Sequence, residues 1–279
     1  MAQVYFVKDK DPEMQRAIER ARESFRYFWR ELAWEQRRII PGLSLSAVKV
    51  PFSDPPEVQH DEDEPTVEQM WLSEIEFDGK LVTGTLLNSP HWLKSISEGD
   101  QSQVPISGIS DWMYAIGERV YGAYTVNLLR SQMGSSERKE HDSAWGLDFG
   151  DPNKIEVVPP EWFGAKPKAG FFKRLFGGGA DDTPPVDPET AEHPMAVNMA
   201  DSLREFLSQD PMNVYQSDDK GWTMLHQQAL AGTAIGVSIL LEHGADANAA
   251  ANDGTRPLEL AQSLGWKQVI EVLISHGAK

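Results

Sequence analysis

The C-terminal part of the chain repeats itself at a fixed interval, and this repeat constrains the fold more than any other feature of the sequence. Three glycines, the last within a His-Gly-Ala triplet, recur 33 positions later: Gly221 and Gly254, Gly232 and Gly265, Gly244 and Gly277. A constant period of this length is typical of solenoid arrays, in which one supersecondary unit stacks on the next. The period therefore predicts a stacked module at this end of the chain.

The sequences of the two copies indicate the kind of repeat. They read DDKGWTMLHQQALAGTAIGVSILLEHGADANA (218–249) and ANDGTRPLELAQSLGWKQVIEVLISHGAK (251–279). Both resemble ankyrin repeats, although the Thr-Pro-Leu-His box of that family is only partly kept, as TMLH from Thr223 and RPLE from Arg256. The resemblance implies a glycine-tipped turn and two antiparallel helices per copy. The stretch before them matches the second helix of a capping unit, which gives an all-α module of a cap and two repeats over residues 196–279.

The resemblance to ankyrin repeats also implies where a partner protein would bind. In that family the turn tips and the exposed part of the first helix form a binding surface. At Trp222 and Leu230, large apolar residues stand where solvent exposure is expected, so either a partner or the chain's own N-terminal domain covers them. His226 is expected to hold its turn by hydrogen bonds and not to bind a metal. The surface maps onto Asp219, Lys220, Trp222, Leu230, Ala231, Asn252, Thr255, Ser263 and Leu264.

The N-terminal half has a different pattern, a long helix followed by strands. Asp11 is placed to cap a helix and Pro12 to occupy its first position, and apolar residues then recur at steps of three and four as far as Leu32. The apolar period then changes to two, and Asp78-Gly79 separates two such runs as a hairpin turn. This pattern predicts an α+β domain over residues 1–160, with a long helix on a mostly antiparallel sheet.

Several positions in this half match a known bacterial domain. They are Trp71, Gly79, Gly84, Asn88, Pro90, Asp111, Trp112, Gly122 and Thr125. Together they resemble DUF2314, a bacterial domain of unknown function that occurs alone and joined to ankyrin repeats, over roughly residues 3–150. The resemblance implies a fold and a bacterial setting, and it implies no activity.

Asp111 and Trp112 leave two interpretations open. The favoured one is structural, with the carboxylate capping a backbone turn while the indole fills the core. The alternative is an enzyme with an unrecognised pocket at these two residues. The sequence carries no HExxH, GxSxG or phosphate-cradling glycine motif, and it has no cysteine. We therefore expect no catalytic residue, no metal ligand and no cofactor.

Acidic residues dominate the charge of the chain, which has 26 Lys and Arg, 43 Asp and Glu, and a formal net charge of −17. Such a charge repels a phosphate polymer, so nucleic acid is not an expected partner. The densest acidic run is Asp61, Glu62, Asp63 and Glu64, which is either a solvated loop or a docking strip for a basic protein. We expect a non-catalytic binding protein, in its most concrete form an acidic immunity or antitoxin protein that neutralises a basic toxin.

Residues 161–195 are rich in Gly, Pro, Asp and Thr, a composition typical of a flexible linker. Within it lies the FFKRLF segment, Phe171–Phe176. Docking onto one of the chain's own domains is the favoured interpretation of this segment, with a partner or a membrane surface as alternatives. The chain shows no signal peptide and no apolar stretch of about 20 residues, the length needed to span a bilayer. A cytoplasmic protein is expected.

Overall fold

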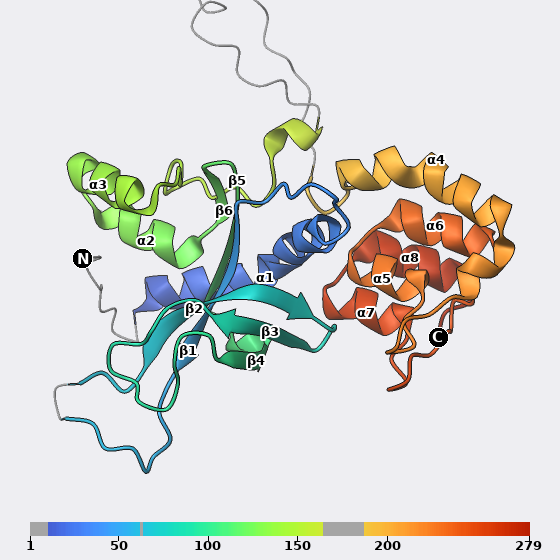
Figure 1. The fold of residues 1–279 in the computed structure, drawn as a ribbon. Helices are drawn as coiled ribbons and strands as arrows, with labels where there is room; N and C mark the ends of the chain where they lie inside the picture. The colour runs from blue at the N-terminus through green and yellow to red at the C-terminus, as the bar shows by residue number, and fades with distance from the viewer. Residues whose placement is uncertain (1–10, 62–63, 164–186) are drawn as a thin grey trace, which may run out of the picture. The chain divides into compact units, whose positions relative to one another are not determined.

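The computed structural model describes residues 11–61, 64–163 and 187–279. The chain divides into two compact units, Met1–Val157 and Val158–Lys279. In the first unit all strand pairs of the sheet are antiparallel, in the order β4-β3-β2-β1-β5-β6, which confirms the predicted fold class (Figure 1). Its elements are α1 (Pro12–Glu35), β1 (Leu45–Phe52), β2 (Glu68–Phe77), β3 (Leu81–Leu86), β4 (Gln101–Pro105), η1 (Ile106–Gly108), β5 (Asp111–Ile116), β6 (Arg119–Gly122), α2 (Tyr124–Gln132) and α3 (Ser135–Trp145).

Helix α1 begins where the sequence predicted. The carboxylate of Asp11 accepts a hydrogen bond from the backbone N–H of Glu13 at 2.8 Å, and Pro12 occupies the first helical position. The aromatic side of the helix lies on the sheet, where the ring centroids of Phe28 and Trp112 are 5.8 Å apart. The indole Nε1 of Trp112 also donates to the carbonyl of Ala21 at 2.7 Å, so the helix is fixed by a polar as well as an apolar contact.

The hairpin predicted at Asp78-Gly79 joins β2 to β3. The carboxylate of Asp78 accepts hydrogen bonds from the backbone N–H groups of Lys80 and Leu81, at 2.8 and 2.7 Å. Gly79 has a φ of 90°, a backbone conformation that other residues rarely adopt. This prediction is confirmed, because the aspartate caps the turn and the glycine takes the positive φ.

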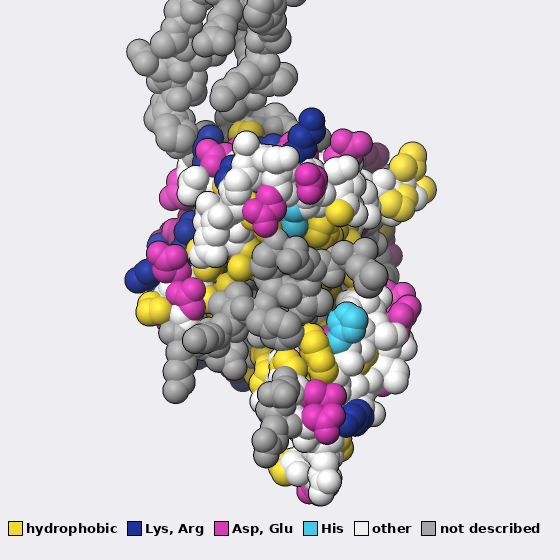
Figure 2. Space-filling model, turned by 90° about the vertical axis from the view of Figure 1, so that its left-hand side faces the viewer, with side chains coloured by type: hydrophobic (Ala, Val, Ile, Leu, Met, Phe, Trp, Pro, Cys, Tyr) yellow, Lys and Arg dark blue, Asp and Glu magenta, His cyan; other side chains and the backbone are white. Residues whose placement is uncertain are grey.

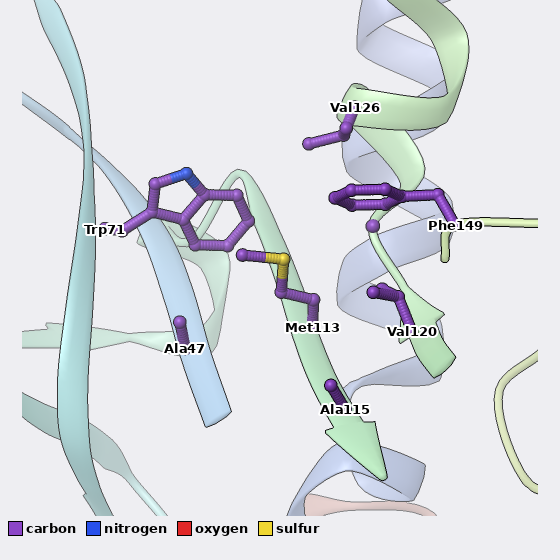
Figure 3. Close-up of a cluster of buried hydrophobic side chains, with 8 residues drawn as sticks. Ala47, Trp71, Met113, Ala115, Val120, Val126 and Phe149 are labelled. Carbon is purple, nitrogen blue, oxygen red and sulfur yellow. The ribbon is translucent and has the colours of Figure 1, made fainter. Parts of the chain in front are cut away.

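A second apolar cluster lies on the face of the sheet away from α1. Neighbouring residues of a strand point to opposite faces, so Met113 points away from the helix that Trp112 contacts. Figure 3 shows the side chains of Trp71, Met113 and Phe149 converging there, with Val126 of α2 above them. Helix α2 and the segment after α3 therefore close this side of the sheet.

The second unit is a stacked helical array. Helices α5 and α7 pack on each other as the first helices of two repeats, and α4, α6 and α8 stack in the same order as second helices. Helix α4 thus takes the place predicted for the second helix of a cap. The turn glycines Gly221 and Gly254 have φ angles of 78° and 84°. The elements are η2 (Pro160–Phe163), α4 (Pro194–Gln209), η4 (Pro211–Tyr215), α5 (Met224–Leu230), α6 (Ala234–Glu242), α7 (Pro257–Ser263) and α8 (Lys267–Ser275).

The residues just before α4 form an ion pair and a hydrogen bond with helices of the array. Glu189 pairs with Lys267 at 2.8 Å, and Glu192 accepts a hydrogen bond from the backbone N–H of Ile235 at 2.7 Å. His193 is buried, and its Nδ1 accepts from the backbone N–H of Met195 as the N-cap of α4. The expected linker 161–195 thus includes residues that contact the helices of the array, while its Phe171–Phe176 segment lies outside the described residues.

Candidate partner-binding site

The two glycine turns of the array form a continuous surface, which we call the turn edge and define as residues 217–223 and 251–255. In the first turn the carboxylate of Asp218 accepts hydrogen bonds from the backbone N–H groups of Lys220 and Trp222, at 2.9 and 2.8 Å. In the second, Asp253 accepts from the backbone N–H of Thr255 at 3.0 Å and from its hydroxyl at 2.7 Å. Each turn is therefore held in shape by its own aspartate.

Asn252 joins the two turns. Its backbone N–H donates to the carbonyl of Lys220 at 3.0 Å, and its Nδ2 donates to the carbonyl of Asp219 at 2.8 Å. From the sequence, Asn252 was predicted to lie on the binding surface. In the structure its side chain is exposed, and it also fixes the spacing of the turns.

Trp222 lies on a rigid support. Its ring stacks on that of His226, with centroids 6.1 Å apart and an interplanar angle of 25°. His226 is fully buried: its Nδ1 lies 3.1 Å from the backbone N of Thr223, and its Nε2 lies 3.1 Å from the carbonyl oxygen of Thr255 in the next repeat. Burial lowers the pKa of His226, although hydrogen bonds to backbone groups of Thr255 and Ala249 oppose the effect. The predicted structural role of His226 is confirmed, and the half-buried indole of Trp222 rests on its buried imidazole.

Four of the predicted surface residues are buried. Leu230 and Ala231 were expected to face solvent, but only 2% and 0% of their surface is exposed. The reason lies in the second repeat, where the indole Nε1 of Trp266 donates to the carbonyl of Leu230 at 3.1 Å and so covers the end of α5. Thr255 and Leu264 are also buried. The prediction of exposure is wrong for these residues, because their cover comes from other parts of the fold.

The turn edge keeps an exposed polar set around Trp222. Asp219 and Lys220 are exposed, as the sequence predicted, and so is Ser263 at the end of α7. Asp218 and Asp253 are exposed too, and the sequence analysis missed them. Their signal was present, because an aspartate directly before a glycine-containing turn commonly caps it. The described turn edge therefore carries three exposed carboxylates beside one aromatic ring.

The acidic strip of the first unit is partly bound within that unit. The Oε2 of Glu64 lies 3.5 Å from Nδ1 of His60 and 3.8 Å from Nζ of Lys94. On its other side, His60 Nε2 lies 3.0 Å from the carboxylate of Asp54. Asp61 is exposed, while Glu62 and Asp63 lie outside the described residues. In the face drawn in Figure 2, acidic side chains are interspersed with basic and apolar ones.

Asp111 has the structural role that the sequence analysis favoured. Its carboxylate accepts from the backbone N–H groups of Trp112, Tyr124 and Thr125, and from the Thr125 hydroxyl at 2.6 Å. Burial raises the pKa of Asp111, and the nearby Lys49 ammonium and these hydrogen bonds oppose the rise. Trp112 is fully buried. Both residues are committed to joining β5 to α2 and α1, which argues against the alternative of a pocket at this point.

Among the described residues, the His, Asp and Glu side chains form no group of three or more suited to holding a metal ion. None of the helices within the described ranges has the length and apolar character that crossing a bilayer requires.

The fold and the turn edge define an ankyrin-repeat protein with an α+β domain at its N-terminal side. The family model of ankyrin repeats, in three copies, matches residues 191–279. The model of the uncharacterized proteins conserved in bacteria known as DUF2314 matches residues 11–149. The chain belongs to the DUF2314 family, in the form that is joined to ankyrin repeats.

Relatives share this arrangement to different extents. An ankyrin repeat protein of Neisseria meningitidis serogroup B is 39% identical over 271 residues, which are 97% of this chain and 96% of the relative. The uncharacterized protein YegJ of Escherichia coli is 29% identical over 83 residues, 30% of this chain and 48% of the relative. Among solved structures, the human ASB11 ankyrin repeat domain matches with 28% identity and a TM-score of 0.27, covering 32% of this chain and 41% of that one. Because ankyrin repeats are protein-interaction modules, a protein partner is the function that the array implies.

Proposed function

We propose that the chain is a non-catalytic cytoplasmic binding protein whose turn edge captures a basic protein. The observation that carries this proposal is the half-exposed Trp222, held flat on His226 and flanked by the exposed carboxylates of Asp218, Asp219 and Asp253. A rigid aromatic ring is the usual anchor of an interface, because it buries a large area at a low entropic cost. Carboxylates around it favour Lys and Arg on the partner.

The finer form of the proposal is an immunity or antitoxin protein. A net charge of −17 speeds the encounter with a basic toxin and disfavours binding to acidic surfaces. Occlusion of a toxin needs an accessible binding surface and no chemistry, and the exposed residues of the turn edge would supply that surface. This role predicts that the captured protein is basic and harmful to the host when expressed by itself.

The first experiment replaces the anchor. Trp222→Ala should weaken binding of the captured partner by about 2 kcal/mol, the scale of an interface hot spot, because the imidazole underneath cannot replace the lost area. The partner is first captured from a lysate of the host bacterium and identified by mass spectrometry, and the affinity is then measured by calorimetry. Trp145→Ala is the matched control, because this tryptophan of α3 is 41% exposed in the other unit. Equal affinity of the wild type and Trp222→Ala for the partner would exclude the turn edge as the binding site.

The second experiment neutralises the carboxylates. Asp218→Asn, Asp219→Asn and Asp253→Asn together keep the side-chain oxygens that cap the turns, so the fold should survive. We expect slower association with the partner and a flatter dependence of the rate on salt. The control changes the same number of charges at exposed glutamates of the first unit, Glu57, Glu118 and Glu140, to Gln. If both triple variants slow association equally, only overall charge matters and the proposed site is wrong.

A further inference from the structure

Helix α4 carries a row of apolar side chains that the fold leaves open to solvent. Met199 is 44% exposed and Phe206 is 45% exposed. Met195 and Leu203 are half-buried and share their side of the helix, because the four residues follow one another at steps of four and three. We call these four residues the α4 stripe. The outer unit of a repeat array normally presents a polar surface to water, so an open apolar stripe is unexpected at this place.

The repeat period explains why the stripe is open. The residue 33 positions after Phe206 is Ile239 of α6, and it is fully buried. Helix α6 lies between α4 and α8 in the stack, whereas α4 begins it (Figure 1). In the described part of the second unit, only η2 precedes α4. Phe206 thus occupies a position that is covered inside the array, at the end of the array where no earlier repeat covers it.

The stretch of chain that contains Phe171–Phe176 begins and ends beside the start of α4. On one side of it, the ring of Trp162 lies against that of His193, the N-cap of α4, with centroids 4.5 Å apart. On the other side, Glu192 is bonded to α6. Phe176 lies 16 positions before Glu192, and 16 residues extend at most about 55 Å. Helix α4 has 16 residues and a length of about 24 Å, so the whole stripe is within reach.

The FFKRLF segment matches the stripe in both polarity and charge. Its apolar residues are spaced to share one side of a helix and its basic residues the other, the two sets being Phe171, Phe172, Leu175 and Phe176, and Lys173 and Arg174. Helix α4 offers exposed carboxylates at Glu205, directly before Phe206, and at Asp210, one turn after it. Apolar side chains of the segment can therefore meet those of the stripe while its two cations meet two carboxylates.

We propose that the FFKRLF segment docks on the α4 stripe of its own chain and covers the open end of the array. Because the segment is tethered on both sides, docking is intramolecular and needs little intrinsic affinity. Stable interfaces between separate proteins bury about 1,200–2,000 Å², more than four partly exposed side chains offer. A tethered segment is therefore a better cover for the stripe than a second copy of the chain.

Disulfide formation between two introduced thiols tests the docking, because the chain has no cysteine of its own. In the full chain, Gly177→Cys is combined with Ser202→Cys, an exposed position between Met199 and Phe206 on the same side of α4. The matched control combines Gly177→Cys with Ser208→Cys, which is also exposed but lies two positions after Phe206 and so faces away from the stripe.

Under mild oxidation, the pair with Ser202→Cys should form a disulfide within one chain roughly tenfold or more faster than the control pair, because docking raises the local concentration of one thiol at the other. Peptide mapping by mass spectrometry gives the rates and separates disulfides within one chain from those between two. Phe172→Ser together with Phe176→Ser, added to the first pair, should lower its rate to that of the control, because the apolar contacts are lost.

Three outcomes would overturn the proposal. Equal rates for the two cysteine pairs would show that the segment moves past α4 without docking. Disulfides that link two chains would identify a second copy as the cover of the stripe. A rate that is unchanged by Phe172→Ser with Phe176→Ser would show that the apolar residues of the segment do not hold it there.

Discussion

At position 122 the surrounding structure permits only glycine. It has a φ of 79°, and a Cβ built on it would lie 2.4 Å from the ring of Trp112. The neighbour is a fully buried indole bonded to Ala21, so it has little room to move. Glycine is required here for two separate reasons, the backbone conformation and the close approach of the ring.

Replacing Gly122 by Ala should therefore destabilise the first unit by about 2 kcal/mol or more, because it adds strain at a positive φ to a clash in the core. The measurement is chemical denaturation of the full chain, followed by hydrogen exchange in residues 111–132. Gly117→Ala is the control, because Gly117 also has a positive φ, of 58°, but a Cβ there meets nothing within 4 Å. Similar decreases in the free energy of unfolding of the two variants would show that backbone strain alone explains the effect.

His226 makes the stability of the repeats depend on pH. Its pKa is lowered in the folded chain, so the unfolded chain binds a proton more readily. The stabilisation is complete above the unfolded pKa of about 6.5 and is lost as the pH falls below that value. We expect hydrogen-exchange protection of residues 223–275 to fall between about pH 7 and about pH 5. His226→Gln should lower protection at every pH and flatten this dependence, whereas His276→Gln, at an exposed position, should keep it.

At the scale of elements, an ion pair between a buried arginine and a partly exposed aspartate holds α3 to α2. Arg130 of α2 is 1% exposed, and its Nε and Nη2 donate to the two carboxylate oxygens of Asp142 of α3 at 2.8 and 2.6 Å. The guanidinium also lies over the ring of Phe149, 5.2 Å from its centre. Helix α3 has no buried residue of its own, so polar contacts attach it: this pair, and the hydrogen bonds that Arg138 donates to the carbonyls of Arg130 and Met133.

Asp142→Asn should loosen α3 and destabilise the first unit by about 1–3 kcal/mol, because it leaves a buried guanidinium without its charged partner. Faster hydrogen exchange in residues 135–145 would report the loosening. Asp201→Asn on α4 is the matched control: it breaks the Asp201–Arg204 pair, in which Asp201 is fully exposed. Surface pairs of that kind contribute little, so the control should leave stability unchanged.

Elements were predictable from the sequence where their causes are local. The start of α1 follows from Asp11 and Pro12, and the repeat turns follow from glycines at a fixed period. Positions whose environment comes from distant residues were not predictable. Leu230 is covered by a residue 36 positions later, and Lys49 has its neighbours on two other strands. The two glycine turns were thus predictable, while the burial of several residues expected on the surface beside them required the structure.

At the scale of the whole molecule, the array includes more of the chain than its repeats. Glu189 and Glu192 bind helices of the array, and His193 caps α4. A fragment of residues 187–279 should therefore be more stable than one of residues 196–279, by about 1–3 kcal/mol, the range of one helix cap and one or two charged hydrogen bonds.

Thermal denaturation of the two fragments, beside the full chain, measures this difference. Both fragments should melt below the full chain, because a cap and two repeats are near the lower limit of size for an independent array. A fragment of residues 187–279 carrying Glu192→Gln separates the contribution of the Ile235 contact. Equal melting of the two fragments would show that residues 187–195 add nothing.

The bond between the two turns has a consequence for how such proteins lengthen. Asn252 donates to the carbonyl of Asp219, the residue 33 positions before it and hence its own equivalent in the first repeat. A hydrogen bond between equivalent positions can be copied with the repeat itself. Each copied turn would carry the asparagine amide as a donor to the turn before it, and a backbone carbonyl as an acceptor for the turn after it. Duplication of the 33-residue segment that carries Asn252 would therefore add a matching hydrogen bond at once, without a second change elsewhere. The reach of the turn edge can grow by gene duplication while each new turn remains free to vary its exposed residues for a different partner.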